Sequence, residues 1–255
     1  MIEKKFINIG SCDFGMEGWL NLDKPCQHYA SRQQPIDIVY DLMSLNPITL
    51  RDECLEIAYT SHTIEHISDE CVHHLFREVY RILKKGGTFR ITCPDIGKCY
   101  DAYVAGDEEY ISNWLLNPAG HKKFRSLGIG ERFLFIFASY LSPYRDNINL
   151  NNKIKKYKEH EIEKIFKSMN KHDALTFFAS RCQQYASILQ PRFPGEHIGW
   201  WDYDKLKDTL EVAGFKNITR QKFNQSNNKD LKDFDCHNCD NVKTLNYTLF
   251  LECEK

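Results

Sequence analysis

Three short apolar runs near the start of the chain each end at a residue suited to ligand binding. Gly10, Asp23 and Asp41 follow the runs 5–9, 19–22 and 36–40. Runs of this length between turn residues are typical of buried strands. Ligands in open α/β sheets bind at the carboxyl ends of the strands. There a glycine lets the backbone approach a ligand closely, and a carboxylate can accept two hydrogen bonds from a ribose diol.

Each of these residues also has a plainer interpretation. Gly10 alone is consistent with an ordinary strand-to-loop turn, and Asp41 with the start of the turn toward Asn46 and Pro47. The three positions together, at these intervals, are more specific than any one of them. They favour a ligand site at one edge of a parallel sheet.

The stretch 54–95 predicts a strand, a polar turn, an amphipathic helix and a second strand. Leu55–Thr60 is the first strand, and Ser68 is a candidate N-cap. The apolar stripe of this helix consists of Val72, Leu75, Phe76, Val79, Ile82 and Leu83. Lys84 and Lys85 suit the end of a helix, and Gly86 and Gly87 are expected to stop it before the strand 88–93. The order predicts a right-handed parallel βαβ unit.

Two motifs could bind a metal, and neither predicts a site. His62, Glu65 and His66 spell H-x-x-E-H, a zinc-protease signature. That motif belongs within a long helix, whereas here a strand ends just before it and Ser68 places the helix start after it. Cys236 and Cys239 form a C-x-x-C with no second pair to complete a structural zinc site. We therefore expect no metal.

Composition limits the remaining classes of protein. The length of 255 residues suits one large α/β domain, or one domain with a sizeable insert. The net charge of −1 gives no bulk attraction to nucleic acid. Its ten cysteines are scattered, so reduced thiols are expected. No apolar run reaches the roughly 20 residues of a membrane span, and no signal segment follows Met1. We expect a cytoplasmic protein; its oligomeric state is not indicated.

The motifs resemble class I S-adenosylmethionine-dependent methyltransferases, in the branch of type 11. The segment 7–23 reads I-N-I-G-S-C-D-F-G-M-E-G-W-L-N-L-D, and S-H-T-I-E-H and C-P-D follow later strands. The first glycine motif departs from the family, because Ser11 and Cys12 occupy positions where further glycines are usual. The likeness covers about the first hundred residues and resumes near His197.

This resemblance implies a fold and a set of roles. The fold is a doubly wound α/β sheet of seven strands with a helical insert after strand five. The cofactor is S-adenosylmethionine, with Asp23 on the ribose diol, Asp41 on the adenine edge, and His197 at the mouth of the acceptor pocket. The full set expected to bind the cofactor is Gly10, Ser11, Cys12, Asp23, Asp41, Leu42, Ser61 and His62.

The spacing of the first two strands has a consequence of its own. Only residues 11–18 separate them, whereas parallel neighbours normally need a crossover of a dozen or more. The usual first helix must be missing or cut to about one turn. We therefore expect this chain to have a shortened first βα unit compared with the type 11 branch that it resembles.

The chain divides into three expected parts. Residues 1–96 form the cofactor-binding part and 197–255 the C-terminal part of the α/β domain, which holds the helix before Gly214, strand 215–223 and the antiparallel strand 245–252. Residues 97–196 form a helical insert. The resemblance suggests a lid over the acceptor pocket, and a packing subdomain without substrate contact is the alternative.

The function expected is methyl transfer to a small or medium-sized acceptor. An oxygen acceptor needs a base, for which His197 is the first candidate and Asp95 the second; packing of His197 on Trp200 or Trp201 is the plainer interpretation. Relatives of this branch often accompany polysaccharide enzymes, which suggests a sugar-linked acceptor. A non-catalytic cofactor-sensing or protein-binding module of the same fold is the alternative, favoured by Ser11 and Cys12.

Overall fold

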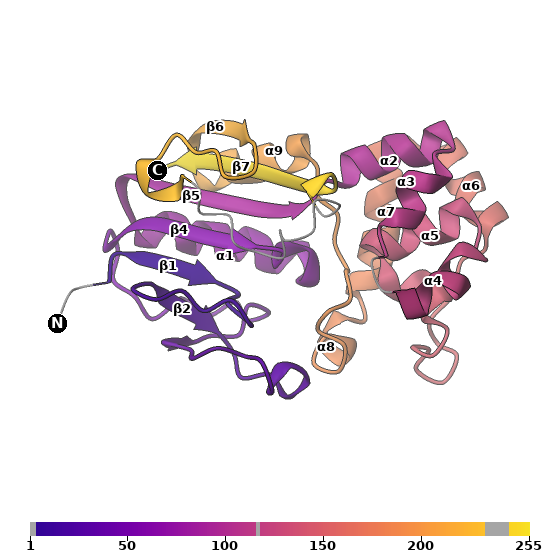
Figure 1. Cartoon of the computed structure of the whole chain (residues 1–255), viewed down its shortest axis with the longest axis horizontal. Coiled ribbons are helices and arrows are strands. Elements are labelled where there is room, and N and C mark those ends of the chain that lie inside the picture. The colour runs from indigo at the N-terminus through magenta and orange to yellow at the C-terminus, as the bar shows by residue number, and fades with distance from the viewer. Residues whose placement is uncertain (1–3, 116–117, 233–244) are drawn as a thin grey trace. The chain divides into compact units, whose positions relative to one another are not determined.

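The computed structural model describes residues 4–115, 118–232 and 245–255. The chain forms two compact units (Figure 1). Unit 1 comprises Met1–Cys93 and Tyr203–Lys255, and unit 2 comprises Pro94–Asp202. The C-x-x-C pair Cys236 and Cys239 lies outside the described residues, and the eight cysteines within them form no disulfide.

Unit 1 contains one seven-stranded sheet with the order β3-β2-β1-β4-β5-β7-β6. Its strands are β1 (Phe6–Ile9), β2 (Leu20–Asp23), β3 (Ile38–Val39), β4 (Leu55–Ser61), β5 (Leu83–Pro94), β6 (Lys216–Gln221) and β7 (Thr248–Glu254). The pairs among β1 to β5 are parallel, and β7 is antiparallel to β6. This seven-stranded, largely parallel sheet with flanking helices confirms the predicted α/β fold class. The third strand was predicted too long, since β3 has only two residues, and the last strand too early, since β7 runs from Thr248 to Glu254.

The connection from β1 to β2 contains turns and no helix over residues 10–19. Two buried amides hold it in place. Asn8 Nδ2 donates to the Phe14 carbonyl at 2.7 Å and to Asn21 Oδ1 at 3.2 Å. Asn21 Oδ1 also accepts from the Met16 N–H at 2.9 Å. Side-chain amides can serve donors and acceptors at once, so these two satisfy backbone groups that a helix would otherwise pair internally.

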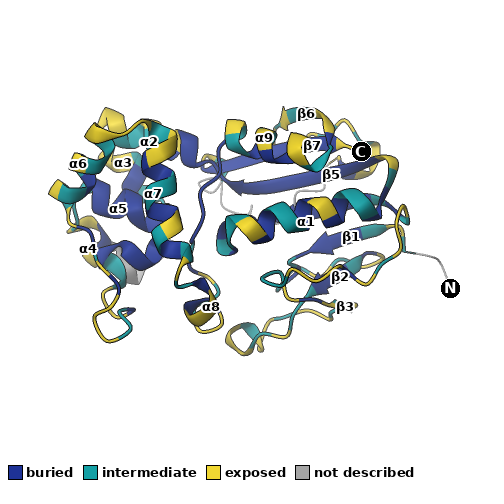
Figure 2. Ribbon diagram, turned by 180° about the vertical axis from the view of Figure 1, so that it is seen from behind, coloured by how far each residue is buried: buried dark blue, intermediate teal, exposed yellow. Residues whose placement is uncertain are grey.

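Two helices cover one face of this sheet (Figure 2): α1 (Asp69–Ile82) and α9 (Tyr203–Ala213). Ser68 caps α1 as predicted, accepting from the Cys71 N–H, and Gly214 ends α9 with φ +106°. The predicted stop at Gly86 and Gly87 was wrong. Helix α1 ends at Ile82 and β5 begins at once, because Leu83 is fully buried and pairs with Leu55 of β4.

The opposite face of the sheet carries a different cover. Trp19, Ile57, Tyr59 and Leu231 form a buried cluster there, the last from the 3₁₀ turn Lys229–Leu231. Because side chains alternate along a strand, Tyr59 points away from the face where Phe89 packs on Phe76 of α1. The segment leading to that turn thus covers the face that lacks a first helix.

A buried ion pair holds this cover. Arg90 of β5 and Glu252 of β7 meet at 2.7 Å, with side chains 0% and 4% exposed. Arg90 Nη1 also donates to the Gln225 carbonyl at 2.9 Å, and Glu252 Oε2 accepts from the Asn227 N–H at 3.1 Å. The pair therefore links two strands to the segment that crosses them.

Removing one partner of this pair should be costly. We expect Arg90→Met to lower the free energy of unfolding by about 3–5 kcal/mol, because Glu252 is left buried and uncompensated. The double variant Arg90→Met, Glu252→Leu should recover much of that loss. Urea denaturation measures both. Equal destabilisation by the single and double variants would contradict a role for the charge pair.

Unit 2 is helical. Its α-helices are α2 (Ile96–Ala105), α3 (Glu108–Asn113), α4 (Pro118–Arg125), α5 (Ile129–Phe137), α6 (Glu159–Ser168), α7 (Lys171–Gln183) and α8 (Ala186–Leu189). The core element is α5, which is buried from Gly130 to Phe137. Phe133 packs against Tyr100, Tyr103 and Phe166, with ring centroids 5.1–6.3 Å apart. None of the helices in the described part of the chain has the length and apolar character needed to cross a membrane.

A half-buried lysine lies near this core. Lys156 Nζ donates to the Tyr140 carbonyl at 2.5 Å. Burial lowers the pKa of Lys156 from 10.5 to about 8, although Cys182, Asp146 and Glu196 act in the opposite direction. Folding thus penalises the charged amine.

The sign of the pH effect follows from this lowered pKa. Below pH 8 the amine is charged in both states and the penalty is complete. Between about pH 8 and 10.5 only the unfolded chain keeps the proton, so the contribution of Lys156 to stability rises with pH. We expect Lys156→Met to be more stable than wild type at pH 7, with the difference shrinking toward pH 10. Denaturation at both pH values tests this, with exposed Lys164→Met as control. A pH-independent difference would contradict it.

Candidate active site

The carboxyl ends of β1 and β4 meet at Gly10. This residue has φ +72°, and a Cβ there would lie 2.5 Å from Thr63 Oγ1. Both facts exclude a larger residue. Thr63 itself is fixed, since its hydroxyl donates to the Ser61 carbonyl at 3.0 Å. Gly10 therefore has no side chain that could cover its own backbone.

Asp23, at the end of β2, holds the loop that follows β1. Its Oδ2 accepts from the Cys12 N–H and its Oδ1 from the Lys24 N–H, both at 2.7 Å. Burial raises the pKa of Asp23, and these two N–H groups oppose the shift. A carboxylate has about four acceptor positions. Asp23 can therefore hold the loop and still accept both hydroxyls of a ribose.

Ser11 and Cys12 lie between these two positions. Ser11 is fully buried, and its Oγ has no hydrogen-bond partner among the described residues. A buried hydroxyl without a partner is costly, and a bound ligand could supply one. Cys12 has φ +40°. Burial, with Asp13 and Asp23 nearby, raises the pKa of its thiol to about 12, so Cys12 stays protonated at neutral pH and is a poor nucleophile.

Asp41 follows β3 and is more exposed than Asp23. Its Oδ2 is paired with Lys24 Nζ at 2.8 Å, and its Oδ1 accepts from the Met43 N–H at 2.9 Å. The neighbouring Leu42 is half-buried. Lys24 therefore stands beside both carboxylates of the strand ends, which the sequence did not lead us to expect.

The segment after β4 is fixed by hydrogen bonds to neighbouring strands. Ser61 Oγ and Thr92 Oγ1 are 2.6 Å apart, and the His62 N–H donates to the Thr92 carbonyl at 2.9 Å. His62, with φ +48°, places Nδ1 3.2 Å from Glu65 and Nε2 3.4 Å from Thr248 Oγ1. Both ring nitrogens thus have partners within unit 1.

The same segment rules out the geometry of an H-x-x-E-H protease helix. Residues Ile64–His66 form a single 3₁₀ turn, and α1 begins at Asp69. The buried Glu65 carboxylate lies between His62 and His66, at 3.2 and 3.8 Å. The two histidines therefore flank a carboxylate here and do not project from adjacent turns of one helix.

The two candidate bases both lie in unit 2. His197 Nδ1 is 2.7 Å from the Ile136 carbonyl, which can only accept, so Nδ1 carries the proton and Nε2 the lone pair. The His197 N–H donates to Ser139 Oγ at 3.1 Å. His197 also packs edge-on against Trp114.

Asp95 has a structural task. It is the N-cap of α2, where its Oδ1 accepts from the Lys98 N–H at 3.2 Å. The carboxylate is buried. One of its oxygens is thus used in holding the helix, which leaves His197 as the stronger candidate.

Contacts within unit 1 join the predicted strand-end residues into one site. Gly10 adjoins Thr63, Cys12 binds Asp23, and Lys24 connects onward to Asp41. Sequence reasoning missed Thr63, Lys24 and the amide pair Asn8 and Asn21. The signal for the amides was present, because buried-strand positions rarely hold asparagine without a partner.

These residues fit the nucleoside and methionine parts of S-adenosylmethionine. A bare glycine backbone, a buried serine hydroxyl with no partner in the described part of the chain, and a carboxylate with spare acceptor positions lie next to one another. When bound, the sulfonium of this cofactor supplies a methyl group already activated for displacement. The protein needs to hold it and to exclude water.

A family comparison agrees with this site. Residues 14–91 match the family model described as a methyltransferase domain. The matched segment runs from the loop after β1 into β5, so it contains Asp23, Asp41 and Ser61 but begins after Gly10, Ser11 and Cys12. Over this segment the chain is similar to the methyltransferase domain of type 11.

Several solved structures are similar at low identity. A SAM-dependent methyltransferase from Archaeoglobus fulgidus is 12% identical with a TM-score of 0.43, over 98% of this chain and 85% of that one. One from Mesorhizobium loti is 12% identical at 0.41, over 98% and 90%. Phosphoethanolamine N-methyltransferase 2 of Haemonchus contortus, in complex with S-adenosylmethionine, is 12% identical at 0.40, over 98% and 48%. Such distant likenesses carry no argument about the acceptor. No curated protein matches the sequence.

Asp23 should be the position most sensitive to substitution. Two hydrogen bonds to a charged acceptor are worth on the order of 1.5–3 kcal/mol each. We expect Asp23→Ala to weaken S-adenosylmethionine binding roughly a hundredfold to ten-thousandfold in calorimetry. Asp52 lies just before the amino end of β4, whereas the site lies at the carboxyl ends of the strands. Asp52→Ala should therefore bind S-adenosylmethionine like wild type.

The same substitution also removes the acceptors of two backbone N–H groups. We therefore include Asp23→Asn, which keeps one acceptor oxygen, and a thermal melt of each variant. Tight binding by Asp23→Ala would show that the ribose lies elsewhere.

Proposed function

We propose that the chain transfers a methyl group from S-adenosylmethionine to a small or medium-sized, sugar-linked acceptor. The cofactor would lie across the ends of β1, β2, β3 and β4. Gly10, Ser11 and Cys12 would line its methionine side, Asp23 would bind the ribose, Asp41 and Leu42 would meet the adenine, and Ser61 and His62 would form the near wall. The observation that carries the proposal is the buried Ser11 hydroxyl beside Gly10 and Asp23.

His197 would act as general base toward an acceptor hydroxyl. The hydrogen bond from Nδ1 to the Ile136 carbonyl leaves Nε2 as the basic nitrogen. A positioned base typically contributes about 10²–10⁴-fold to rate. Asp95 is the second candidate, with its capping bond to Lys98 as the competing role.

The helical insert 97–196 would serve as a lid that shapes the acceptor pocket. Its aromatic core around Phe133 supports a stable independent layer. The sugar-linked acceptor is supported by the resemblance to the type 11 branch. A small-molecule acceptor also agrees with the net charge of −1, which gives no general attraction to nucleic acid.

The test is transfer of a labelled methyl group. We would incubate the protein with methyl-labelled S-adenosylmethionine and a panel of uronic acids, hexosamines and nucleotide sugars, and measure S-adenosylhomocysteine and labelled sugar. Labelled product from at least one sugar is expected. Cofactor binding with transfer only to non-sugar acceptors would overturn the sugar link, and absence of cofactor binding would favour a non-catalytic module.

His197→Asn should separate binding from chemistry. The asparagine amide can still donate to the Ile136 carbonyl but offers no base. We expect kcat to fall about 10²–10⁴-fold, with the calorimetric affinity for S-adenosylmethionine within twofold of wild type. The exposed His160→Asn serves as control. Unchanged kcat in His197→Asn would remove His197 as the base.

A further inference from the structure

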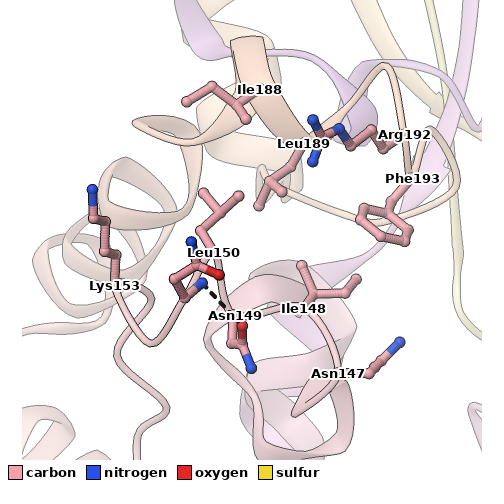
Figure 3. A pocket seen from close by; sticks show the side chains of 10 residues that line it. Asn147, Ile148, Asn149, Leu150, Lys153, Ile188, Leu189, Arg192 and Phe193 are labelled. Atoms are coloured by element: carbon pink, nitrogen blue, oxygen red, sulfur yellow. Dashed lines mark hydrogen bonds between the residues drawn. The ribbon is translucent and has the colours of Figure 1, made fainter.

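Unit 2 contains a pocket of about 430 Å³ between residues 147–153 and residues 188–193 (Figure 3). Ligand pockets in proteins typically have volumes of about 300–1,000 Å³. This one lies entirely within unit 2, on the segments before α6 and after α8. None of its residues belongs to the site in unit 1.

Two cations without acidic partners line this pocket. Lys153 and Arg192 are exposed, and within the described residues neither side chain has a hydrogen-bond or ion-pair partner. Several other cations of unit 2 are paired: Arg145 with Glu196, Lys155 with Glu161, and Lys171 with Asp202. In Figure 3 the two side chains come from opposite sides of the pocket. Unpaired charge of one sign around a hollow favours an anionic ligand.

Three amides supply a second kind of recognition. Asn147, Asn149 and Asn151 line the same pocket. A side-chain amide both donates and accepts, as a hydroxyl does. Phe193 and the buried Ile148 add an apolar wall, labelled in Figure 3, against which the C–H face of a sugar ring can pack.

The loop that carries the amides is strained. Leu150, Asn151 and Asn152 have φ values of 44°, 58° and 65°, in the left-handed region. Residues in this region cost free energy, least for asparagine, and persist where the surroundings hold them. Here the Asn151 N–H donates to Asn149 Oδ1 at 3.1 Å, and the Tyr185 hydroxyl donates to the Lys153 carbonyl at 3.2 Å. The amides and Lys153 are thereby held on a preformed turn.

We propose that this pocket binds an anionic sugar, a monosaccharide that carries a carboxylate or a phosphate. Lys153 and Arg192 pair with the anion, the amides bind ring hydroxyls, and Phe193 packs on the ring. A polyanion is disfavoured because the pocket is small and the chain has a net charge of −1. The link from this sugar to the methyl acceptor rests on the proposed function, whereas binding itself does not.

The experiment is a titration of the full chain without cofactor. Glucuronic acid, glucose 6-phosphate, methyl glucoside and inorganic phosphate are added separately, and binding is followed by calorimetry and by the side-chain amide signals of the three asparagines in ¹⁵N-labelled protein. Saturable binding of one or both anionic sugars is expected, at least tenfold tighter than methyl glucoside or phosphate. The carboxylate and phosphate arms show which anion fits. Phosphate alone binding as tightly as the sugars, or no saturable binding at millimolar concentrations, would overturn the proposal.

Variants locate the site. Arg192→Gln and Lys153→Gln should each weaken the favoured sugar about tenfold and reduce the shifts of the asparagine signals. Lys164→Gln removes an exposed, unpaired charge elsewhere in unit 2 and should stay within twofold of wild type. Equal weakening by Lys164→Gln, or unchanged affinity in both pocket variants, would place binding elsewhere. Because cofactor is absent, this result is independent of whether methyl transfer is found.

Discussion

The short connection between β1 and β2 is the constraint on which much of unit 1 depends. Parallel neighbours are usually joined through a helix, which pairs its own backbone groups and covers the sheet. Residues 10–19 have no helix, so both tasks pass to other groups. The side-chain amides of Asn8 and Asn21 form hydrogen bonds with backbone groups of the loop, and the carboxylate of Asp23 at the end of β2 accepts one from the Cys12 N–H. The strand ends therefore build the loop as well as the site.

The sheet face without a first helix needs another cover, and a segment from the other end of the sequence provides it. Residues 222–231 cross that face and are fixed by the Arg90 and Glu252 pair. A buried ion pair is a weak source of net stability. Its bonds to the Gln225 carbonyl and the Asn227 N–H have a more specific effect, because they set where the segment crosses. Leu231 then reaches the cluster with Trp19 and Tyr59.

Local chemistry explains which parts of the structure could be predicted from sequence. The strand ends at Gly10 and Asp23, the Ser68 cap and the Gly214 stop each follow from the residue at that position. The false stop at Gly86 shows the limit. Two glycines normally end a helix, but burial of Leu83 beside Leu55 brings the chain into the sheet five residues before the predicted strand start at Thr88. Thr63 and Lys24 were missed because their roles depend on contacts across the sheet ends. The pocket beside Asn149 joins segments forty residues apart and has no sequence motif.

Asp23 holds the loop and would also bind the ribose, and these two roles affect each other. Its two oxygens already hold the N–H groups of Cys12 and Lys24 at 2.7 Å, so the carboxylate is oriented before any ribose arrives. Burial raises its pKa, which shows that the protein pays to keep the charge there. A ribose diol would add two donors to that partly desolvated carboxylate and offset the cost. A ribose bound there and the loop would stabilise the same ionised group, so binding of one would strengthen the hold on the other. Since Ser11 precedes Cys12 directly, its buried hydroxyl is positioned by this same loop.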